Sequence, residues 1–256
     1  MSKLLWEEFE PLFGDWSRKI KPFFDKGGFD PIYTHLKKES RRGRILTPES
    51  ELTFRCFKET PFDELRVVMC GMSPYHSIVG RTRVADGLLM GCSITNKLQP
   101  SLLKFYEGIH KDVYFKDDKY CKNPDVSYLA KQGVLMLNIA LTTELRKPDK
   151  HIPLWRPFAD YLFKEVINPT GVPVILLGKE AAHFRTSFNP IYGTIVYVTS
   201  HPASAAHLNT DWETKDLYNR KAYEKEKDDV SVFKRVNYIL KNRHGIEIEW
   251  LDMEPF

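Results

Sequence analysis

Three apolar runs in the sequence end in side chains that can take part in chemistry. The run VVMC (67–70) gives way to GMSPYH (71–76), so a small hydroxyl, Ser73, and an imidazole, His76, follow an apolar stretch. A second run ends in the amide of Asn138, and a third is followed by His201. Imidazoles exchange protons near neutral pH, while hydroxyls and amides hold water and read the polar edges of ligands. These points are candidates for parts of one site.

The three runs belong to a set of four with the length and composition of buried strands. Each is rich in Val, Ile or Leu and bounded by Gly, Pro or Asn: 66–71, 133–138, 172–178 and 193–200. Segments with helical spacing lie between them, at 101–112, 155–167 and 180–188. This alternation predicts an α/β fold with a central, mostly parallel four-stranded sheet flanked by helices. Such sheets bind ligands at the carboxyl ends of their strands. The run 172–178 ends only in Gly178 and Lys179.

The remaining segments are expected to pack around this sheet in one domain, residues 1–256. Residues 1–60 are predicted to be helical, because four aromatic residues between Trp6 and Trp16 recur at a spacing that shares one face. The segment 209–229 is dense in charges of both signs and is expected to be a solvated insertion. Residues 232–244 form an amphipathic helical pattern that Gly245 ends, and a strand-like tail follows.

The composition limits the class of protein without deciding it. The 256 residues, 42% of them hydrophobic, are enough for one well-packed domain, and two are allowed. A formal charge of +4 is compatible with a polyanionic partner but also with many ordinary enzymes. The four cysteines form no CxxC pair, so no metal is expected, and Cys70 and Cys92 are predicted to be packed thiols. We see no signal peptide or membrane span, and expect a soluble protein of a reducing compartment.

Several motifs together carry a family resemblance. The segment TPFDELRVVMCGMSPYH (60–76) resembles the first signature of the major family (family 1) of uracil-DNA glycosylases, whose strand ends in Gly-Gln-Asp-Pro-Tyr-His. Further segments resemble later motifs of that family in the same order: 99–109, 131–144, 173–181, 199–207 and 232–250. The resemblance covers nearly the whole chain and implies a three-layer α/β/α fold. It also implies hydrolysis of an N-glycosidic bond in DNA, after the target nucleotide has been flipped out of the helix.

The resemblance assigns roles to residues of the three strand ends. His201 would donate a hydrogen bond to the base oxygen that gains charge, and Asn138 would read the polar edge of the base. Tyr75 would press against the base near its 5-position and exclude a methyl group. His76 would help to hold the water or a phosphate. The chemistry requires no metal or organic cofactor.

The chain departs from the family pattern at several of these positions. Ser73 replaces the catalytic aspartate, so the chain is a divergent member, and Met72 replaces the neighbouring glutamine. Met90 takes the place of the aromatic residue that stacks on the base, within a longer loop. Asp86, in the same loop, is a carboxylate that could substitute for the missing one, although a solvated loop carboxylate is the simpler interpretation.

The DNA contacts implied by the resemblance lie in two further motifs. The residues concerned are Gln99, Pro100, Ser101, Pro202 and Ser204. The leucine that wedges into the duplex in the family becomes Ala205, and Leu208 is expected to reach the same place.

Three functional hypotheses follow. The preferred one is a monomeric DNA glycosylase that removes uracil or a related modified pyrimidine from single- or double-stranded DNA, in the cytoplasm, the nucleoid or a nucleus. The second is a catalytically impaired DNA-binding relative, such as a replication factor or a reader of a modified base, which Ser73 favours. The third is a protein–protein module with a vestigial DNA site. A protein inhibitor or a replication partner is compatible with the first two, and no membrane partner is expected.

Overall fold

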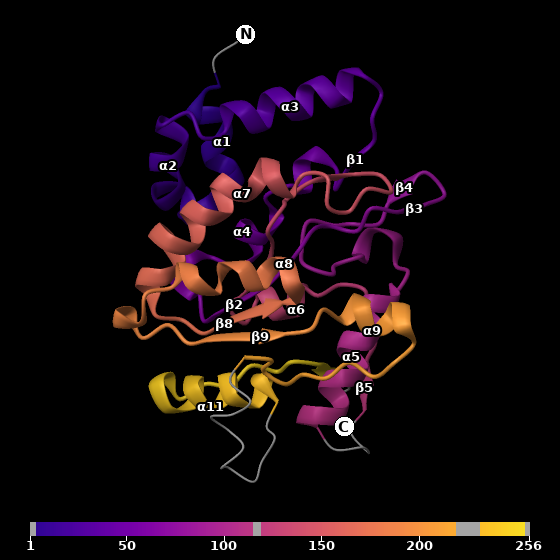
Figure 1. Ribbon diagram of the computed structural model, residues 1–256, viewed down its shortest axis with the longest axis vertical. Helices are drawn as coiled ribbons and strands as arrows, with labels where there is room; N and C mark the ends of the chain where they lie inside the picture. Colours follow the sequence, from indigo (N-terminus) through magenta and orange to yellow (C-terminus); the bar gives the residue numbers. More distant parts are fainter. Residues whose placement is uncertain (1–3, 115–118, 219–230, 254–256) are drawn as a thin grey trace.

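A four-stranded parallel sheet lies at the centre of the structure, a computed structural model that describes residues 4–114, 119–218 and 231–253 (Figure 1). Its strands, in spatial order, are β6 (Val134–Asn138), β2 (Val67–Gly71), β8 (Val174–Leu177) and β9 (Val196–Thr199). Each strand lies within one of the four apolar runs, so the predicted α/β architecture is confirmed. All neighbouring pairs are parallel.

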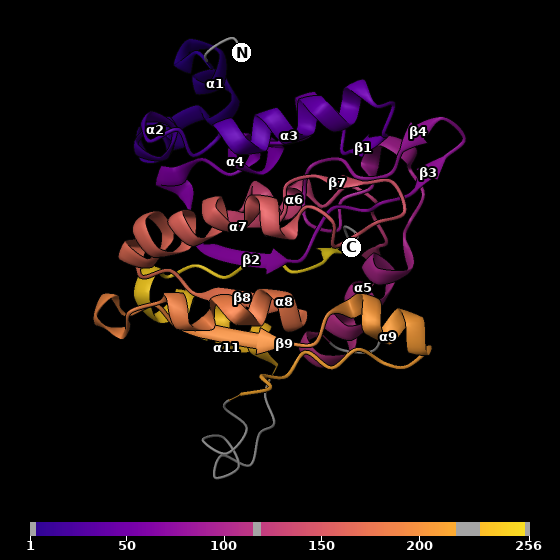
Figure 2. The same ribbon diagram turned by 45° about the horizontal axis from the view of Figure 1, so that its top comes forward.

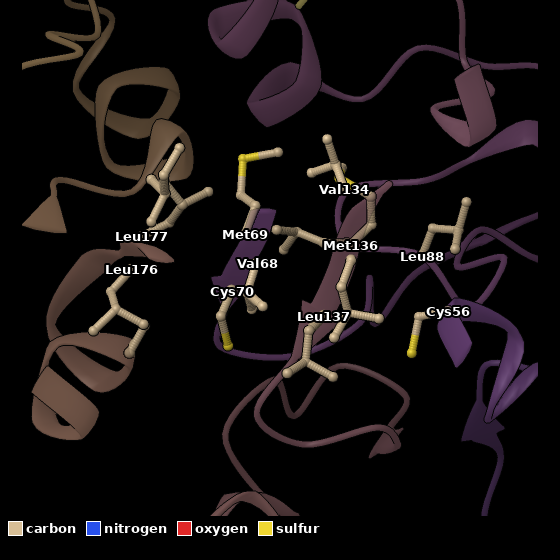
Figure 3. Packing of buried hydrophobic residues seen from close by; sticks show 14 of the residues in the cluster. Cys56, Val68, Met69, Cys70, Leu88, Val134, Met136, Leu137, Leu176 and Leu177 are labelled. Atoms are coloured by element: carbon tan, nitrogen blue, oxygen red, sulfur yellow. The ribbon is translucent and has the colours of Figure 1, made fainter. Parts of the chain in front are cut away.

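The strands are apolar along their whole length because both faces of the sheet are covered. Every residue of β2, β6 and β8 is buried. Figure 3 shows Met69 and Cys70, which are neighbours on β2, pointing to opposite sides of the strand. Since side chains alternate along a strand, a run without polar residues can be buried only between two layers.

The strand order also fixes where a ligand can bind. The chain passes from β2 to β6 on one side and later returns to β8 on the other side of β2. The connections therefore diverge at the carboxyl end of β2, and such a switch point leaves a crevice there in open α/β sheets. This end of β2 carries the segment GMSPYH.

Helices lie on both sides of the sheet. The helices α1–α3 and α7 lie on one side and α11 on the other, in both Figure 1 and Figure 2. Their bounds are α1 (Trp6–Phe13), α2 (Ser17–Asp25), α3 (Asp30–Arg41), α4 (Arg55–Glu59), α5 (Pro100–Val113), α6 (Ser127–Ala130), α7 (Ile152–Tyr161), α8 (Gly178–Ala182), α9 (Pro202–Leu208) and α11 (Val232–His244). Within the described residues, none of the helices is long and apolar enough to cross a bilayer.

The N-terminal helices pack through the aromatic residues that the sequence singled out. Phe13 and Trp16 are fully buried, and Trp6 and Phe9 pack against the same core. Phe57 of α4 contacts both Phe13 and Trp16, with ring centroids 5.6 and 5.2 Å apart. The predicted shared face is therefore confirmed. The packed thiols are confirmed too, since Cys70 and Cys92 are buried.

Short two-stranded ladders complete the described structure. They pair β1 (Leu46–Thr47) with β7 (Thr143–Glu144), β3 (Ile78–Val79) with β4 (Thr82–Arg83), and β5 (Tyr120–Cys121) with β10 (Asp252–Met253).

The predicted strand-like tail is wrong for residues 246–250. The side chain of Asn237 on α11 bonds both backbone groups of Ile248, at 2.9 and 3.0 Å. The hydroxyl of Tyr128 donates to the carbonyl of Trp250 at 2.9 Å. Side chains thus take the hydrogen bonds that a neighbouring strand would have supplied, and only Asp252–Met253 joins a ladder.

The predicted solvated insertion also needs correction in its first half. Trp212 is 2% exposed and lies between Phe105 and Phe233, with centroids 5.7 and 5.9 Å away. The hydroxyl of Thr214 bonds to Asp112 and to Ser231. The charged residues of 209–218 therefore flank a buried tryptophan. Because they dominate the composition of the segment, the sequence predicted that all of it would be solvated. Residues 219–229 lie outside the described part of the chain.

Candidate active site

The carboxyl ends of the four strands converge, as the topology requires. Gly71 of β2 lies beside Asn138 of β6, and the pairing continues past the strands through a 3.0 Å bond from the Ile139 N–H to the Gly71 carbonyl. A Cβ atom added to Gly71 would lie only 3.2 Å from Nε2 of His201, and one added to Gly178 would lie 2.9 Å from the Cβ of His201. Glycine at these two positions lets the imidazole approach the ends of β2 and β8.

A cavity of about 380 Å³ opens at this junction. Its size falls in the range of small-ligand sites, about 300–1,000 Å³. The predicted site residues that line it are Met72, Ser73, Tyr75, His76, Met90, Ser101, His201 and Ser204. The structure therefore brings together residues that lie up to 132 positions apart between Met72 and Ser204.

His201 is held in one tautomer. Its Nδ1 accepts a 3.0 Å hydrogen bond from the Ala203 N–H at the start of α9, so in the neutral ring the proton is on Nε2. Burial lowers the pKa of His201 to about 4, which keeps the ring neutral at physiological pH. The proton-bearing Nε2 is also the atom that approaches Gly71. The ring is therefore a fixed, neutral hydrogen-bond donor at the cavity.

Tyr75 forms a stiff wall of the cavity. Its hydroxyl and that of Ser101, in the first turn of α5, are 2.7 Å apart, and its carbonyl accepts a 2.9 Å bond from the Thr47 hydroxyl. Burial raises the pKa of Tyr75 well above its usual value, so it stays neutral. Both ends of the residue are tied, which fixes the ring without a contact from a ligand.

Asn138 is the last residue of β6 and is buried. Its side chain is 3% exposed, and among the described residues its Oδ1 has no hydrogen-bond partner. A buried acceptor without a hydrogen bond lowers the stability of a protein by roughly 1–3 kcal/mol, so its presence calls for a functional explanation. Asn138 is not among the residues that line the cavity surface. It lies next to Gly71 across the β2–β6 pair, where a donor that enters between the strand ends would meet it.

Comparison with known proteins shows to which family the chain belongs. A sequence model of the Uracil DNA glycosylase superfamily matches residues 57–225, more than half of the chain. The chain belongs to that superfamily. The resemblance predicted from the sequence motifs is thereby confirmed.

Individual relatives agree with the superfamily match. A uracil-DNA glycosylase of Campylobacter fetus is 33% identical over 202 residues, which cover 75% of this chain and 79% of the relative. One of Chlamydia trachomatis is 27% identical over 248 residues, covering 94% and 96%. A solved mimivirus uracil-DNA glycosylase has a TM-score of 0.77 at 21% identity, covering 97% of this chain and 90% of the other. A single-residue variant of a mimivirus enzyme, solved in complex with UGI, scores 0.78.

Membership of the uracil-DNA glycosylase superfamily identifies the chain as a DNA N-glycosylase, a hydrolase of the bond between a base and its sugar. It also raises the question of how a serine, Ser73, can serve in place of the aspartate of the family pattern. Ser73 lines the cavity, so the serine occupies the position at the strand end where the family resemblance puts an aspartate. His76 lines the cavity as well, and burial lowers its pKa, which favours the neutral ring.

Asp86 does not replace the missing carboxylate. It is fully buried, and Arg55 Nη1 lies 3.0 Å from its Oδ2. The Ser93 hydroxyl and N–H and the Leu88 N–H donate to it as well. It is not among the cavity-lining residues, so it braces the loop 86–93 from behind. The interpretation of Asp86 as a solvated loop carboxylate is equally wrong.

This brace positions the loop that carries Met90. Met90 has a positive φ of 59°, which side chains rarely adopt, yet it is only 5% exposed. The loop is also tied to the sheet by a 3.0 Å bond from the Leu89 N–H to the Met136 carbonyl. Met90 thus lines the cavity as expected, held by the surrounding contacts.

Sequence reasoning missed two charged residues of the cavity. Lys179 and Glu180 follow β8 in the first turn of α8 and line the cavity beside His201. The carboxylate of Glu180 lies 3.7 Å from the guanidinium of Arg156. In the sequence, these two residues are marked only by their position after the strand end at Gly178. The family motif gave neither charge a role.

Only some of the residues predicted to contact DNA line the cavity. Ser101 and Ser204 line the cavity, whereas Gln99, Pro100 and Pro202 do not. Pro202 is buried as the first residue of α9. Leu208 ends α9 and is 69% exposed, outside the cavity lining, while Ala205 is only 6% exposed.

Proposed function

We propose that this protein flips uracil, or a closely related pyrimidine, out of DNA into the 380 Å³ cavity and hydrolyses its bond to the sugar. One observation carries the proposal. His201 is a neutral imidazole whose Nε2 proton faces the meeting point of the strand ends, in a chain of the uracil-DNA glycosylase superfamily. Flipping costs a few kcal/mol and is required because the reacting bond is inaccessible within the stack.

The reaction places negative charge on the leaving base and positive charge on the sugar. As the bond between the sugar carbon and the base nitrogen breaks, its electron pair goes to the base. A water oxygen then bonds to the sugar carbon, and the proton that this water loses is taken up, directly or through solvent, by the base anion, which leaves as the neutral base. The Nε2 proton of His201 stabilises the base oxygen that gains charge, because a donor fixed beforehand needs no reorganisation during the reaction.

Base selection is assigned to Asn138 and Tyr75. The carboxamide of Asn138 offers an acceptor and two donors, which match the adjacent N–H and carbonyl of uracil. Its unpaired Oδ1 is the acceptor that the base N–H would satisfy. Tyr75, fixed through Ser101 and Thr47, limits the room near the 5-position. Met72 and Met90 supply the soft apolar surface for the base.

Ser73 is assigned to hold the attacking water, with His76 beside it on the cavity wall. A hydroxyl orients a water but brings no charge to stabilise the sugar cation. We therefore expect slow hydrolysis, since the loss of one fixed electrostatic group commonly lowers a rate by about 10²–10³.

The test is base release from single-stranded DNA that contains one uracil. His201→Ala and Asn138→Ala should each lower the single-turnover rate by about 10²–10³, because each removes a group aimed at the base. The matched control is His207→Ala, an exposed histidine on α9 that does not line the cavity. Unchanged release by the two cavity variants would refute the site assignment.

The second candidate is binding of the flipped base without hydrolysis, which Ser73 alone favours. It predicts tight binding of uracil-containing DNA and no release from any of a panel of modified pyrimidines. The third, a protein–protein module, predicts no DNA affinity at physiological salt. Release of uracil by the purified protein would exclude both of these alternatives.

We further propose that the chain acts as a monomer of one domain wherever DNA is held, in a nucleoid or a nucleus. One structural neighbour was solved in complex with UGI. By analogy, we propose that a protein inhibitor of this kind also binds this chain. Co-elution of this protein with UGI would support it, and separate elution at micromolar concentrations would count against it.

A further inference from the structure

The hairpin β3–β4 follows the cavity wall directly. It begins two residues after His76, pairs Ile78 with Arg83 and Val79 with Thr82, and turns at Gly80 and Arg81. Gly80 has a positive φ of 62°, which tight hairpin turns require. In Figures 1 and 2 the hairpin projects at the side toward which β2 points, as does α9. The two elements therefore flank the end of the sheet that carries the cavity.

The base of the hairpin is fixed while its tip is exposed. The Val84 N–H donates to the Ser77 carbonyl at 3.1 Å, the Arg146 N–H donates to the His76 carbonyl at 2.8 Å, and Arg83 forms an ion pair with Glu49. Val84 is fully buried. The tip is thus presented on an ordered support.

The tip exposes two aliphatic side chains in part. Ile78 is 40% exposed and Val79 is 38% exposed. Neighbouring residues on a strand point to opposite faces, so each face of the hairpin carries one exposed aliphatic side chain. Arg81 at the turn is exposed as well. Apolar side chains beside a cation are the combination that minor-groove wedges use: they fill an opened base step while the cation meets phosphate.

The family resemblance places the wedge residue at position 205, and the side chain there is too small for that role. Ala205 is small and, as a buried residue of α9, only 6% exposed. We propose that the tip of β3–β4, through Ile78, Val79 and Arg81, is the element that enters the duplex and occupies the space left by the flipped nucleotide. This inference rests on the proposed function, because it requires a flipped base.

The test compares uracil release from a duplex with release from the single strand of the same sequence. The double variant Ile78→Ala/Val79→Ala should lose about tenfold or more on the duplex and less than about twofold on the single strand, because only a duplex must be opened. The matched control is Ile191→Ala. Ile191 is 80% exposed in the turn before β9, at the opposite end of the strands.

Arg81→Ala supplies an independent readout. It should reduce the slope of log affinity against log salt for the duplex by about one phosphate contact, near 0.9. A 2-aminopurine placed beside the uracil should brighten on binding to the wild type and much less on binding to the double variant. That signal reports opening of the stack even if no base is released, so failure of hydrolysis and failure of the hairpin assignment are distinguishable.

Two results would overturn the proposal. One is an equal loss, or no loss, on duplex and single strand together with unchanged 2-aminopurine brightening. The other is a duplex-selective loss caused by Leu208→Ala alone, which would make the end of α9 the wedge. Both substituted hairpin residues are exposed, and a thermal melt close to that of the wild type checks that the variants fold.

Discussion

At the scale of single residues, the missing charge at Ser73 is the largest departure from the family pattern. A carboxylate there would add the electrostatic term that a hydroxyl lacks. Ser73→Asp is therefore expected to raise the single-turnover rate of uracil release by about 10²–10³. The measurement is release from a uracil-containing single strand, with Ser73→Ala as the control that removes the hydroxyl without adding charge.

The opposite outcome is equally informative. If Ser73→Asp gives no gain while the protein stays folded, the rest of the pocket has been rebuilt around serine. Met72 and Met90 are the residues to examine in that case, because both line the same cavity and both differ from the family pattern.

At the scale of elements, the loop 86–93 depends on Asp86. Removing one partner of a buried ion pair costs about 3–5 kcal/mol, and Asp86→Asn should reach the lower end of that range because Arg55 keeps some contact with solvent. The measurement is the free energy of unfolding in urea. Glu59→Gln is the matched control: it also removes a partner of Arg55, but a partly exposed one, and should cost below about 1 kcal/mol.

Asp86→Asn should also slow uracil release, because the loop places Met90 in the cavity wall. If the variant keeps full stability and loses only hydrolysis, then Asp86 acts in the reaction and its assignment as a brace is wrong.

The elements were the most predictable part of the molecule. Four apolar runs and the rule that parallel strands share their carboxyl edge were enough to bring Ser73, Asn138 and His201 together. Lys179 and Glu180 were missed because their role depends on the direction in which α8 leaves its strand. Trp212 was missed because one buried aromatic weighs little against the charges around it. Asp86 was wrongly predicted to be a solvated loop carboxylate, because its partner Arg55 lies 31 residues upstream and no local pattern links the two.

At the scale of the whole molecule, two histidines with a strongly lowered pKa couple its stability to pH. Burial lowers the pKa of His201 to about 4, and burial together with the nearby positive charge of His35 and Lys150 does the same for His151. His151 is fully buried, and its Nδ1 lies 2.9 Å from the Thr142 hydroxyl. An unfolded chain takes up protons on histidine below about pH 6.5, whereas these two sites do not until about pH 4.

The unfolded state therefore binds more protons than the folded state between pH 6.5 and 4, and stability must fall as the pH falls through that window. The free energy of unfolding should be level above about pH 7 and decline steadily from pH 6.5 to 5, before carboxylates titrate. His151→Gln should flatten that decline even if it lowers stability overall. His207→Gln, at an exposed site, should leave the slope as it is. A slope that His151→Gln does not change would show that His151 is protonated in the folded protein.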